Sequence, residues 1–334
     1  MSNFQFSHQV YKPIPSDGLE QWIWAIRPMP SGSMSRFKRI KRISSNVIRS
    51  RIGKTVLPTQ DLPVDTSPFI SSSHILFNSD LIIERNTKLT AITDSLKYFS
   101  GIKCKVAVHT SRFSEFMDCL SFSNIDTSLW TVYVIRGNSY FDREILSKFE
   151  WPFKKLYIHN LLGKGTNNEK LHSLPLGINP NLTNNINYLK NLEAIISKQF
   201  HLEEKKHIVL MNFDSSTNFA ERSSIIKLYK RKKEISWLPR IESSELFSVY
   251  YNSYFVISPP GAGPDCYRTW EAIVAGAIPI VLDSETPFFN ENFPMWRIDS
   301  WSQIYDLSKE ELLNKYLMIK NHFSDQPEAK KFDI

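Results

Sequence analysis

Apolar positions along the chain fall into short strand-like runs separated by segments with the spacing of an amphipathic helix. In the first half, helical spacing is found at 87–99 and 111–120. The apolar runs that we expect to be strands are 74–77, 105–109, 131–135 and 155–159. Strands that alternate with helices indicate βαβ units, which build a parallel sheet with helices on its faces.

A second alternation of the same kind begins near residue 205. Its expected strands are 207–213, 235–238, 254–257 and 278–282, and its expected helices are 221–232, 245–251, 266–275 and 309–323. Because the pattern starts afresh in a chain of 334 residues, which exceeds the usual size of one core, we predict two α/β domains. The predicted regions are an irregular N-terminal segment (1–70), an N-terminal α/β domain (71–180), a linker with helical spacing at 188–199 (181–204), a C-terminal α/β domain (205–308), and a C-terminal helix and tail (309–334).

Composition indicates a folded protein, since 42% of the residues are hydrophobic and 13% are aromatic. The chain has no run of about 18 apolar residues, so we expect no membrane-spanning helix. The first residues lack a basic flank followed by an apolar stretch, which argues against a secretory signal. Three scattered cysteines argue against a disulfide framework. We therefore expect a cytoplasmic protein.

The net charge of +7 comes from one segment. Residues 36–54 hold eight basic residues and no acid; without these eight, the 41 basic residues fall to 33, against 34 acidic residues. This argues against a general nucleic-acid surface, and no nucleic-acid partner is expected. If the segment is helical, Phe37, Ile40, Ile43 and Val47 share one face, and the helix would make a peripheral contact with the inner face of an anionic membrane. The alternative is a solvated surface helix or a mobile arm.

The stretch 258–271 combines a strand end, a glycine loop and a helix start. Such a junction presents backbone N–H groups and the positive end of a helix dipole to an anion. Ser258 opens the loop, and Gly261 and Gly263 let the backbone approach a phosphate closely. Asp265 is placed to cap the helix that follows.

Two charged residues in the expected helix suit a nucleotide diphosphate. Arg268, in the first turn, can offer a bidentate fork to a pyrophosphate. Glu271 lies three residues further on the same helix face and can accept hydrogen bonds from ribose hydroxyls. The alternatives are a local salt bridge between Asp265 and Arg268, and an exposed helix position for Glu271. The loop has the spacing of neither a dinucleotide fingerprint nor a Walker A loop.

The segment 255–281 resembles the donor-binding segment of exostosin-like glycosyltransferases. The pattern Glu-Ala-x-x-x-Gly-x-x-Pro-x-Val at 271–281 is shared more widely among glycosyltransferases of GT-B architecture. This resemblance implies two Rossmann-like domains facing across a cleft, with the sugar nucleotide held by the C-terminal domain and the acceptor by the N-terminal one. It is strong over 205–300 and thin before that, and residues 1–70 match nothing that we can name.

The resemblance also implies roles for individual residues. Glu271 would hold the donor ribose, Arg268 and the Gly261 and Gly263 amides the diphosphate, and Asp283 a sugar hydroxyl. The loop after the first strand of the second domain faces the same crevice, because ligands of open parallel sheets bind at the carboxyl ends of strands. That loop adds Asn212 and Thr217, with Arg222 behind it. Arg222 is either a second cation for the diphosphate or a surface partner of Glu221 or Asp214.

An inverting transfer needs a base that takes the proton of the acceptor hydroxyl. It should come from the N-terminal domain, where the candidates near strand ends are Asp80, Glu84, His109, Asp142 and His159. We favour His109 and Asp142. The alternative for His109 is a capping or packing residue, and a retaining enzyme would need no such base.

These patterns predict a glycosyltransferase that moves a sugar from a nucleotide diphosphate sugar, foremost a UDP-sugar, to a glycan or lipid-linked glycan acceptor in surface polysaccharide synthesis. No cofactor and no metal are expected, since the chain has no Asp-x-Asp and its histidines lack ligand spacing. Arg268 and the helix dipole would neutralise the leaving diphosphate instead. The alternative is a non-catalytic nucleotide-sugar-binding module; a phosphoryl-transfer enzyme is disfavoured by the missing Walker A loop.

Overall fold

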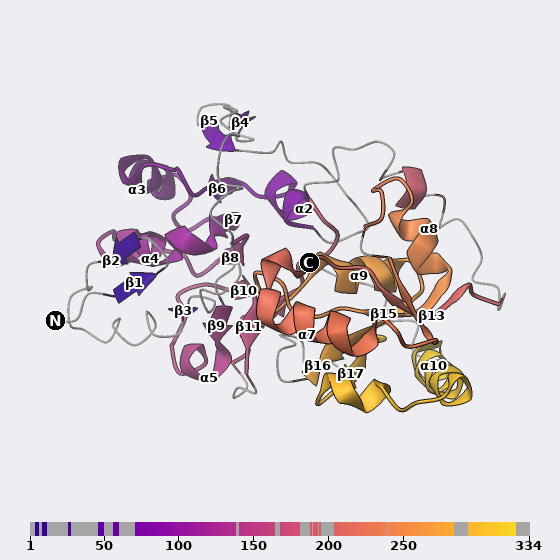
Figure 1. The fold of residues 1–334 in the computed structure, drawn as a ribbon. Coiled ribbons are helices and arrows are strands. Elements are labelled where there is room, and N and C mark those ends of the chain that lie inside the picture. The colour runs from indigo at the N-terminus through magenta and orange to yellow at the C-terminus, as the bar shows by residue number, and fades with distance from the viewer. Residues whose placement is uncertain are drawn as a thin grey trace. The chain divides into compact units, whose positions relative to one another are not determined.

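The computed structural model describes residues 71–137, 140–163, 168–180, 204–238, 240–283 and 293–324, the helical positions 188, 190–192 and 194, and five short strands within residues 4–59. The chain divides into two compact units. The first comprises Met1–Ser31 and Arg36–Pro175, and the second comprises Gly32–Ser35 and Leu176–Ile334. In Figure 1 the first unit runs from indigo to magenta and the second reaches orange and yellow.

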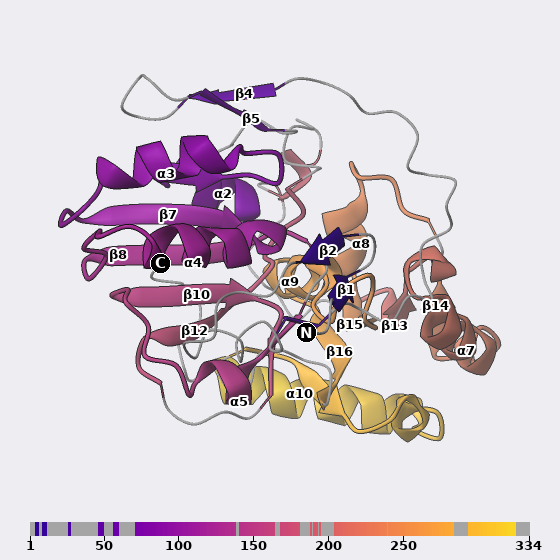
Figure 2. The ribbon, with the colours of Figure 1, turned by 90° about the vertical axis from the view of Figure 1, so that its left-hand side faces the viewer.

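The first unit is built on a sheet of five parallel strands in chain order, β6-β7-β8-β10-β12. These strands are β6 (Leu81–Ile83), β7 (Cys104–His109), β8 (Trp130–Ile135), β10 (Lys155–His159) and β12 (Leu171–Leu174). Figure 2 shows β7, β8, β10 and β12 side by side. The strands predicted at 105–109, 131–135 and 155–159 are thus confirmed.

The crossover segments of this unit pack into one core. They are α3 (Leu89–Lys97), η2 (Thr110–Arg112), α4 (Phe113–Ser121) and α5 (Arg143–Leu146). Ile92 of α3, Phe116 of α4 and Leu146 of α5 join the same buried cluster as Val106 and Val132 of the sheet. The three crossover helices therefore cover one face, as expected for right-handed connections between consecutive parallel strands.

The opposite face of this sheet is contacted by a helix where we expected a strand. Residues 74–77 belong to α2 (Ser72–Phe77), and Ile75 donates its N–H to Ser71 at 3.1 Å in a helical i to i−4 bond. The consecutive residues Ile75 and Leu76 are both buried against Ile82 and Tyr133. The strand prediction was wrong because a four-residue apolar run does not distinguish a short helix from a strand.

Short strands lie in the segment that was predicted to be irregular. They are β1 (Phe4–Phe6), β2 (Gln9–Tyr11), β3 (Ile26–Arg27), β4 (Asn46–Arg49) and β5 (Val56–Thr59). Val47 pairs with Pro58 across the antiparallel β4–β5 ladder, so the expected basic helix does not extend to Val47. Residues 36–45 lie outside the described residues. β3 joins β9 (Tyr140–Asp142) and β11 (Leu161–Leu162) in a small separate sheet.

The second unit holds another five-stranded parallel sheet, with the order β14-β13-β15-β16-β17. Its strands are β13 (His207–Met211), β14 (Ile235–Trp237), β15 (Ser253–Ile257), β16 (Ile278–Leu282) and β17 (Trp296–Ile298). The chain moves from β13 to one side for β14 and then to the other side for β15. The direction of winding therefore reverses between β13 and β15, which makes a topological switch point.

Helices cover both faces of the second sheet. They are α7 (Phe219–Tyr229), α8 (Leu246–Tyr251), α9 (Tyr267–Val274) and α10 (Lys309–Ser324), with short η3 (Ser215–Thr217) and η5 (Trp301–Ile304) turns. Ile225 of α7 and Tyr316 of α10 share a core with Ile280, whereas Trp270 of α9 packs on the neighbouring Val281. Ile280 and Val281 point to opposite faces, as successive strand residues do.

Both units are therefore α/β structures with parallel sheets, which confirms the predicted fold class at that level. No helix in the described part of the chain is both long and apolar enough to cross a membrane.

Candidate functional site

The candidate site lies at the carboxyl ends of β13 and β15, on either side of the switch point. The loop after β13 contains Asn212 and continues into η3 with Thr217. The loop after β15 runs from Ser258 to Asp265 and leads into α9. In open parallel sheets, ligands bind outside the carboxyl ends of strands at such a point. The fold thus brings both loops singled out in the sequence to one edge.

Arg222 holds these two loops together through hydrogen bonds to both. Its Nε donates to the Pro260 carbonyl at 2.8 Å, and Nη2 donates to the Pro259 carbonyl at 3.2 Å. Nη1 donates to the carbonyl of Asp214 in the other loop at 3.0 Å. The side chain is 5% exposed, so its interpretation as a surface residue is wrong. The guanidinium holds the backbone of both loops in place.

Gly261 is tightly packed against the Arg222 side chain. A Cβ atom there would lie 3.0 Å from Arg222 Nη2 and 3.6 Å from Cys266 Sγ, so a side chain at position 261 would push against the Arg222 guanidinium. The Gly261 N–H donates to the Gly263 carbonyl at 2.9 Å, so in this conformation it is engaged within the loop. Thr217 Oγ1 lies 3.7 Å from the same Cβ position and is buried, with no hydrogen-bond partner among the residues that the structure describes. This hydroxyl can serve a bound group.

Arg268 is oriented by the end of β13. Its Nε donates to Asn212 Oδ1 at 3.0 Å, and its Nη2 donates to the Asn212 carbonyl at 3.3 Å. The Tyr250 hydroxyl donates to the same Oδ1 at 3.1 Å, and the Arg268 guanidinium lies 5.5 Å from the Phe213 ring centroid. Arg268 is only partly buried. A cation is thus fixed at the first turn of α9, where the helix dipole is also positive.

Glu271 is a buried carboxylate one turn deeper. It is 4% exposed, so the alternative of an exposed helix position is wrong. Oε1 accepts from the Tyr188 hydroxyl at 2.7 Å and from the Asn179 amide at 3.4 Å. Burial raises the pKa of Glu271, while the Tyr188 hydrogen bond and the Arg268 charge oppose that shift. Because both hydrogen bonds go to Oε1, Oε2 is the oxygen that can accept from a ligand.

Asp265 does not cap α9 as predicted. The cap position is Cys266, whose side chain makes no capping hydrogen bond. The Asp265 carboxylate instead accepts from the Leu176 amide at 2.9 Å and from the Trp270 indole at 2.9 and 3.0 Å. Burial raises its pKa to about 6, against the effect of these donors. The prediction was wrong because the loop turns this side chain inward, where it joins the loop to residue 176.

Ser258 and Asp283 lie at the ends of neighbouring strands but are engaged with protein partners. Ser258 Oγ lies 2.8 Å from Thr269 Oγ1, buried between β15 and α9. Asp283 Oδ1 lies 3.9 Å from Arg297 Nη1, next to the ends of β16 and β17. The segment 284–292 that follows Asp283 lies outside the described residues.

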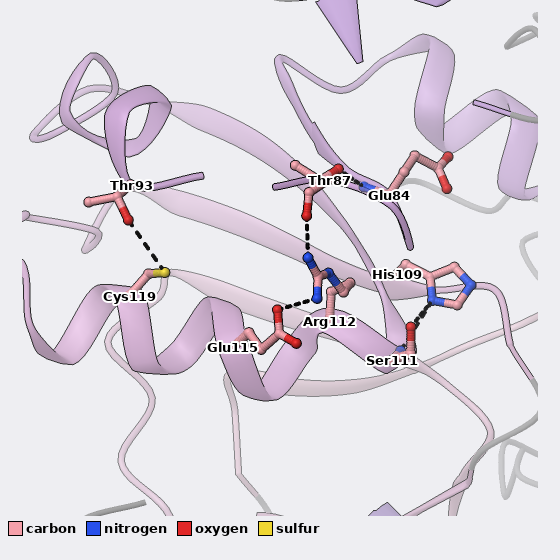
Figure 3. A network of polar contacts seen from close by, with 8 residues as sticks. All are labelled: Glu84, Thr87, Thr93, His109, Ser111, Arg112, Glu115 and Cys119. Carbon is pink, nitrogen blue, oxygen red and sulfur yellow. Dashed lines mark hydrogen bonds and ion pairs between the residues drawn. The ribbon is translucent and has the colours of Figure 1, made fainter. Parts of the chain in front are cut away.

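In the first unit, His109 caps the turn that follows β7. Nδ1 accepts from the Ser111 N–H at 3.2 Å and lies 2.8 Å from Ser111 Oγ (Figure 3). Burial, followed by the charges of Arg136, Arg85 and Arg112, lowers the pKa of His109 to about 4. The imidazole is therefore neutral at pH 7, and its Nδ1 lone pair is engaged in the cap. Beside it, Arg112 bridges the Thr87 carbonyl and Glu115.

Asp142 is also a capping residue. It ends β9, in the small separate sheet, and its Oδ1 accepts from the Ile145 N–H at 3.2 Å at the start of α5. The five-stranded sheet instead ends in residues that the pattern did not single out together. Glu84 Oε1 pairs with Arg136 Nη1 at 3.0 Å, and the Arg136 N–H donates to His159 Nδ1 at 3.3 Å.

Arg136 itself has an unusual backbone conformation. Its φ of 62° is left-handed, and the following Gly137 has a φ of 82°. A Cβ atom at Gly137 would overlap Thr110 Oγ1, which donates to the Arg136 carbonyl at 2.5 Å. The Arg-Gly pair after an apolar strand was the signal in the sequence for this turn. This turn places Arg136, with a strained backbone and a charged side chain, at the carboxyl edge of the first sheet.

The described residues thus define an α/β protein with two parallel five-stranded sheets, the second carrying a polar edge at its switch point. The sequence matches no protein-family model and none of the curated proteins with which it was compared. Within the described ranges, no three His, Cys, Asp or Glu side chains gather as metal ligands would. The functional interpretation therefore rests on the residues of the polar edge.

Proposed function

We propose that the protein is a glycosyltransferase that uses a nucleotide diphosphate sugar, foremost a UDP-sugar. The sugar would pass to a glycan or lipid-linked glycan acceptor, as in surface polysaccharide synthesis. The observation that carries the proposal is the pair Arg268 and Glu271 on one face of α9, at the switch point of the second sheet. The proposal includes the GT-B arrangement that the resemblance implies, with the acceptor on the first unit.

In this proposal the diphosphate binds Arg268 and the N-terminal end of α9. Arg268 is the favoured cation because Arg222 gives its N–H groups to loop carbonyls, whereas Arg268 is partly exposed. The Thr217 hydroxyl adds a polar group beside Gly261. A fixed guanidinium and a helix dipole stabilise the charge that develops on a leaving diphosphate, and a divalent ion is not needed for that step.

The ribose would bind Glu271 through Oε2. Tyr188 and Asn179 fix the carboxylate by holding Oε1, so that the second oxygen is preorganised for a hydroxyl donor. Hydrogen bonds to a charged acceptor in a water-poor site are stronger than neutral ones. Arg268 and Glu271 are three residues apart on α9, which suits the spacing between a diphosphate and its ribose.

Calorimetric titration with UDP-, GDP- and CMP-sugars tests the proposal. Arg268→Ala and Glu271→Ala should each weaken binding of the preferred nucleotide sugar by ~1–3 kcal/mol, as expected for lost charge-assisted hydrogen bonds. The matched controls are Arg240→Ala and Glu242→Ala, an exposed pair with 90% and 74% of the side chains accessible. They should bind as the unchanged protein does. The proposal is refuted if no nucleotide sugar binds, or if both site variants retain full affinity.

A second function, a non-catalytic nucleotide-sugar-binding module, is favoured by one observation. Both residues that the sequence favoured as bases, His109 and Asp142, are engaged as helix caps. The two functions differ in turnover. Slow hydrolysis of the bound donor, or transfer to an acceptor, supports the glycosyltransferase; tight binding with neither reaction supports the module.

A further inference from the structure

Three loops meet at the amino edge of the first sheet, where β7, β8 and β10 begin. They are residues 97–103, 121–129 and 150–155, and they lie on the left of the strands in Figure 2. Backbone and side-chain hydrogen bonds join them. The Gly101 N–H donates to the Asp126 carbonyl at 2.9 Å, and Thr127 Oγ1 donates to the Pro152 carbonyl at 3.0 Å. We call this surface the amino-edge patch.

Large apolar side chains stand out from this patch. Tyr98 is 80% exposed, Phe122 77%, Ile102 50% and Leu129 46%. These four are all of the exposed large apolar side chains in the described part of the first unit. Single exposed apolar residues are ordinary on protein surfaces, but four on joined loops mark an interaction surface.

Helix endings explain why two of these rings face outward. Tyr98 is the C-cap residue of α3 and Phe122 is the C-cap residue of α4. The next residue after Tyr98 turns inward: Phe99 is 7% exposed, and its carbonyl accepts from the buried Trp130 indole at 3.0 Å. The fold buries Phe99 and leaves Tyr98 in solvent, so a polar residue at position 98 would serve the fold equally well.

Basic residues lie in the same three loops as the apolar side chains. Lys97, Lys103, Lys154 and Lys155 are exposed on the three loops, which contain two acids, Asp126 and Glu150. Lysine stems can lie along an apolar surface while the ammonium groups reach anionic headgroups. The same edge thus presents apolar side chains for insertion and cations for the phosphate layer.

We propose that the amino-edge patch binds the surface of an anionic lipid bilayer. A few aromatic and aliphatic side chains on loop tips with lysines beside them suit shallow insertion, in which the rings occupy the headgroup region. None of its residues belongs to the basic segment 36–54. It lies at the opposite edge of the sheet from Glu84 and His109, so that bilayer contact leaves the carboxyl edge open. This inference is independent of the proposed enzymatic function.

Flotation of the full chain with lipid vesicles tests the proposal. The protein should bind vesicles that contain phosphatidylglycerol and bind pure phosphatidylcholine vesicles more weakly. Tyr98→Ser with Phe122→Ser should lower the partition coefficient at least about tenfold. Lys97→Glu with Lys103→Glu should lower it about tenfold or more, and added salt should weaken binding by the unchanged protein.

Matched controls lie on the second unit. Phe219→Ser removes a ring that is 62% exposed, and Arg231→Glu with Lys233→Glu reverses two exposed charges; both variants should bind vesicles normally. Failure of the unchanged protein to bind anionic vesicles would overturn the proposal. So would full binding by the patch variants, which would place the contact elsewhere, for example in 36–54. The proposal would also be overturned if the unchanged protein is a dimer and the Tyr98→Ser with Phe122→Ser variant is a monomer. In that case a second copy of the chain, not a bilayer, would cover the patch.

Discussion

Two arginines at the carboxyl edge of the second sheet differ in role because their N–H groups have different partners. The buried guanidinium of Arg222 donates hydrogen bonds to the carbonyls of Asp214, Pro259 and Pro260. Arg268 is oriented by the side chain and carbonyl of Asn212 and is partly exposed. The same residue type therefore holds the loops together in one case and, in the proposed function, binds the ligand in the other.

This contrast makes a prediction at the scale of single residues. Arg222→Gln should lower the free energy of unfolding by ~3 kcal/mol, because buried carbonyls lose their donors. Arg268→Gln should lower it by less than about 1 kcal/mol while weakening nucleotide-sugar binding, since it removes a partly exposed group. Urea denaturation and calorimetric titration of both variants measure the two effects. Equal losses of stability in the Arg222 and Arg268 variants would contradict the conclusion that Arg222 holds the two loops together.

At the scale of elements, the start of the second sheet is held by one partly buried lysine. Lys205 Nζ donates to the carbonyl of Ser253, the first residue of β15, at 3.0 Å and to that of Gly276, shortly before β16 begins, at 2.8 Å. Rings of Tyr251, Tyr254 and Tyr316 lie within 6 Å of the same Nζ, at 5.7, 5.9 and 5.6 Å. Burial, followed by the charge of Lys320, lowers the pKa of Lys205 to about 7.

The lowered pKa predicts how stability changes with pH. Between about pH 7 and 10 the unfolded state binds a proton at Lys205 that the folded state does not, so stability rises with pH. From pH 7 to 9 the contribution should be roughly 2 kcal/mol. Lys205→Met should remove this slope, whereas Lys230→Met, at an exposed position, should retain it. Urea denaturation of the three proteins at both pH values measures the difference, and parallel slopes would show that Lys205 is not responsible.

Elements with long buried runs could be predicted from the sequence, whereas of the three-residue strands in the two large sheets only β14 was among those expected. The runs at β7, β8, β10, β15 and β16 are apolar for most of their length. In contrast, β6 and β17 have three residues each, and β12 contains His172 and Ser173. Three residues show no periodicity, and polar residues in a buried strand hide it.

The candidate site was predictable where its chemistry is local. Arg268 and Glu271 share a helix face by spacing alone, so the sequence sufficed for their relation. The partners that orient the site come from distant positions: Asn179 is 92 residues from Glu271, Tyr188 is 83, and Leu176 is 89 residues from Asp265. Such contacts depend on how distant parts of the second unit fold back on α9, which no local pattern encodes.

For the whole molecule, the two units have separate cores. The main core of the first unit is formed by residues from Leu81 to Leu171, and that of the second by residues from Val209 to Ile319. In the proposed function, a ligand at the switch point of the second sheet would contact loops of that unit. Its stabilising effect should therefore appear there first.

Hydrogen exchange with and without a nucleotide sugar tests this expectation. Protection should be greatest in residues 212–222 and 258–274, because these backbones form the proposed site. At a ligand concentration of about 100 times Kd, the gain in unfolding free energy of the binding unit should approach ~2.7 kcal/mol. Arg268→Ala serves as the control, since its protection should fall at the same ligand concentration. Protection confined to residues 81–171 would contradict the location of the site.

The order of strands in the first sheet has a consequence for how the protein is made. Because β6, β7, β8, β10 and β12 pair in chain order, each strand can dock on its predecessor as soon as it leaves the ribosome. The contacts formed at each step are close in sequence, which favours rapid folding during synthesis. In the second sheet, β13 lies between β14 and β15. The edge of β13 that pairs with β15 therefore stays unpaired until the chain has formed β14 and crossed back. During synthesis, the first sheet thus grows by adding each new strand at the same edge. The second sheet instead grows at both edges of β13.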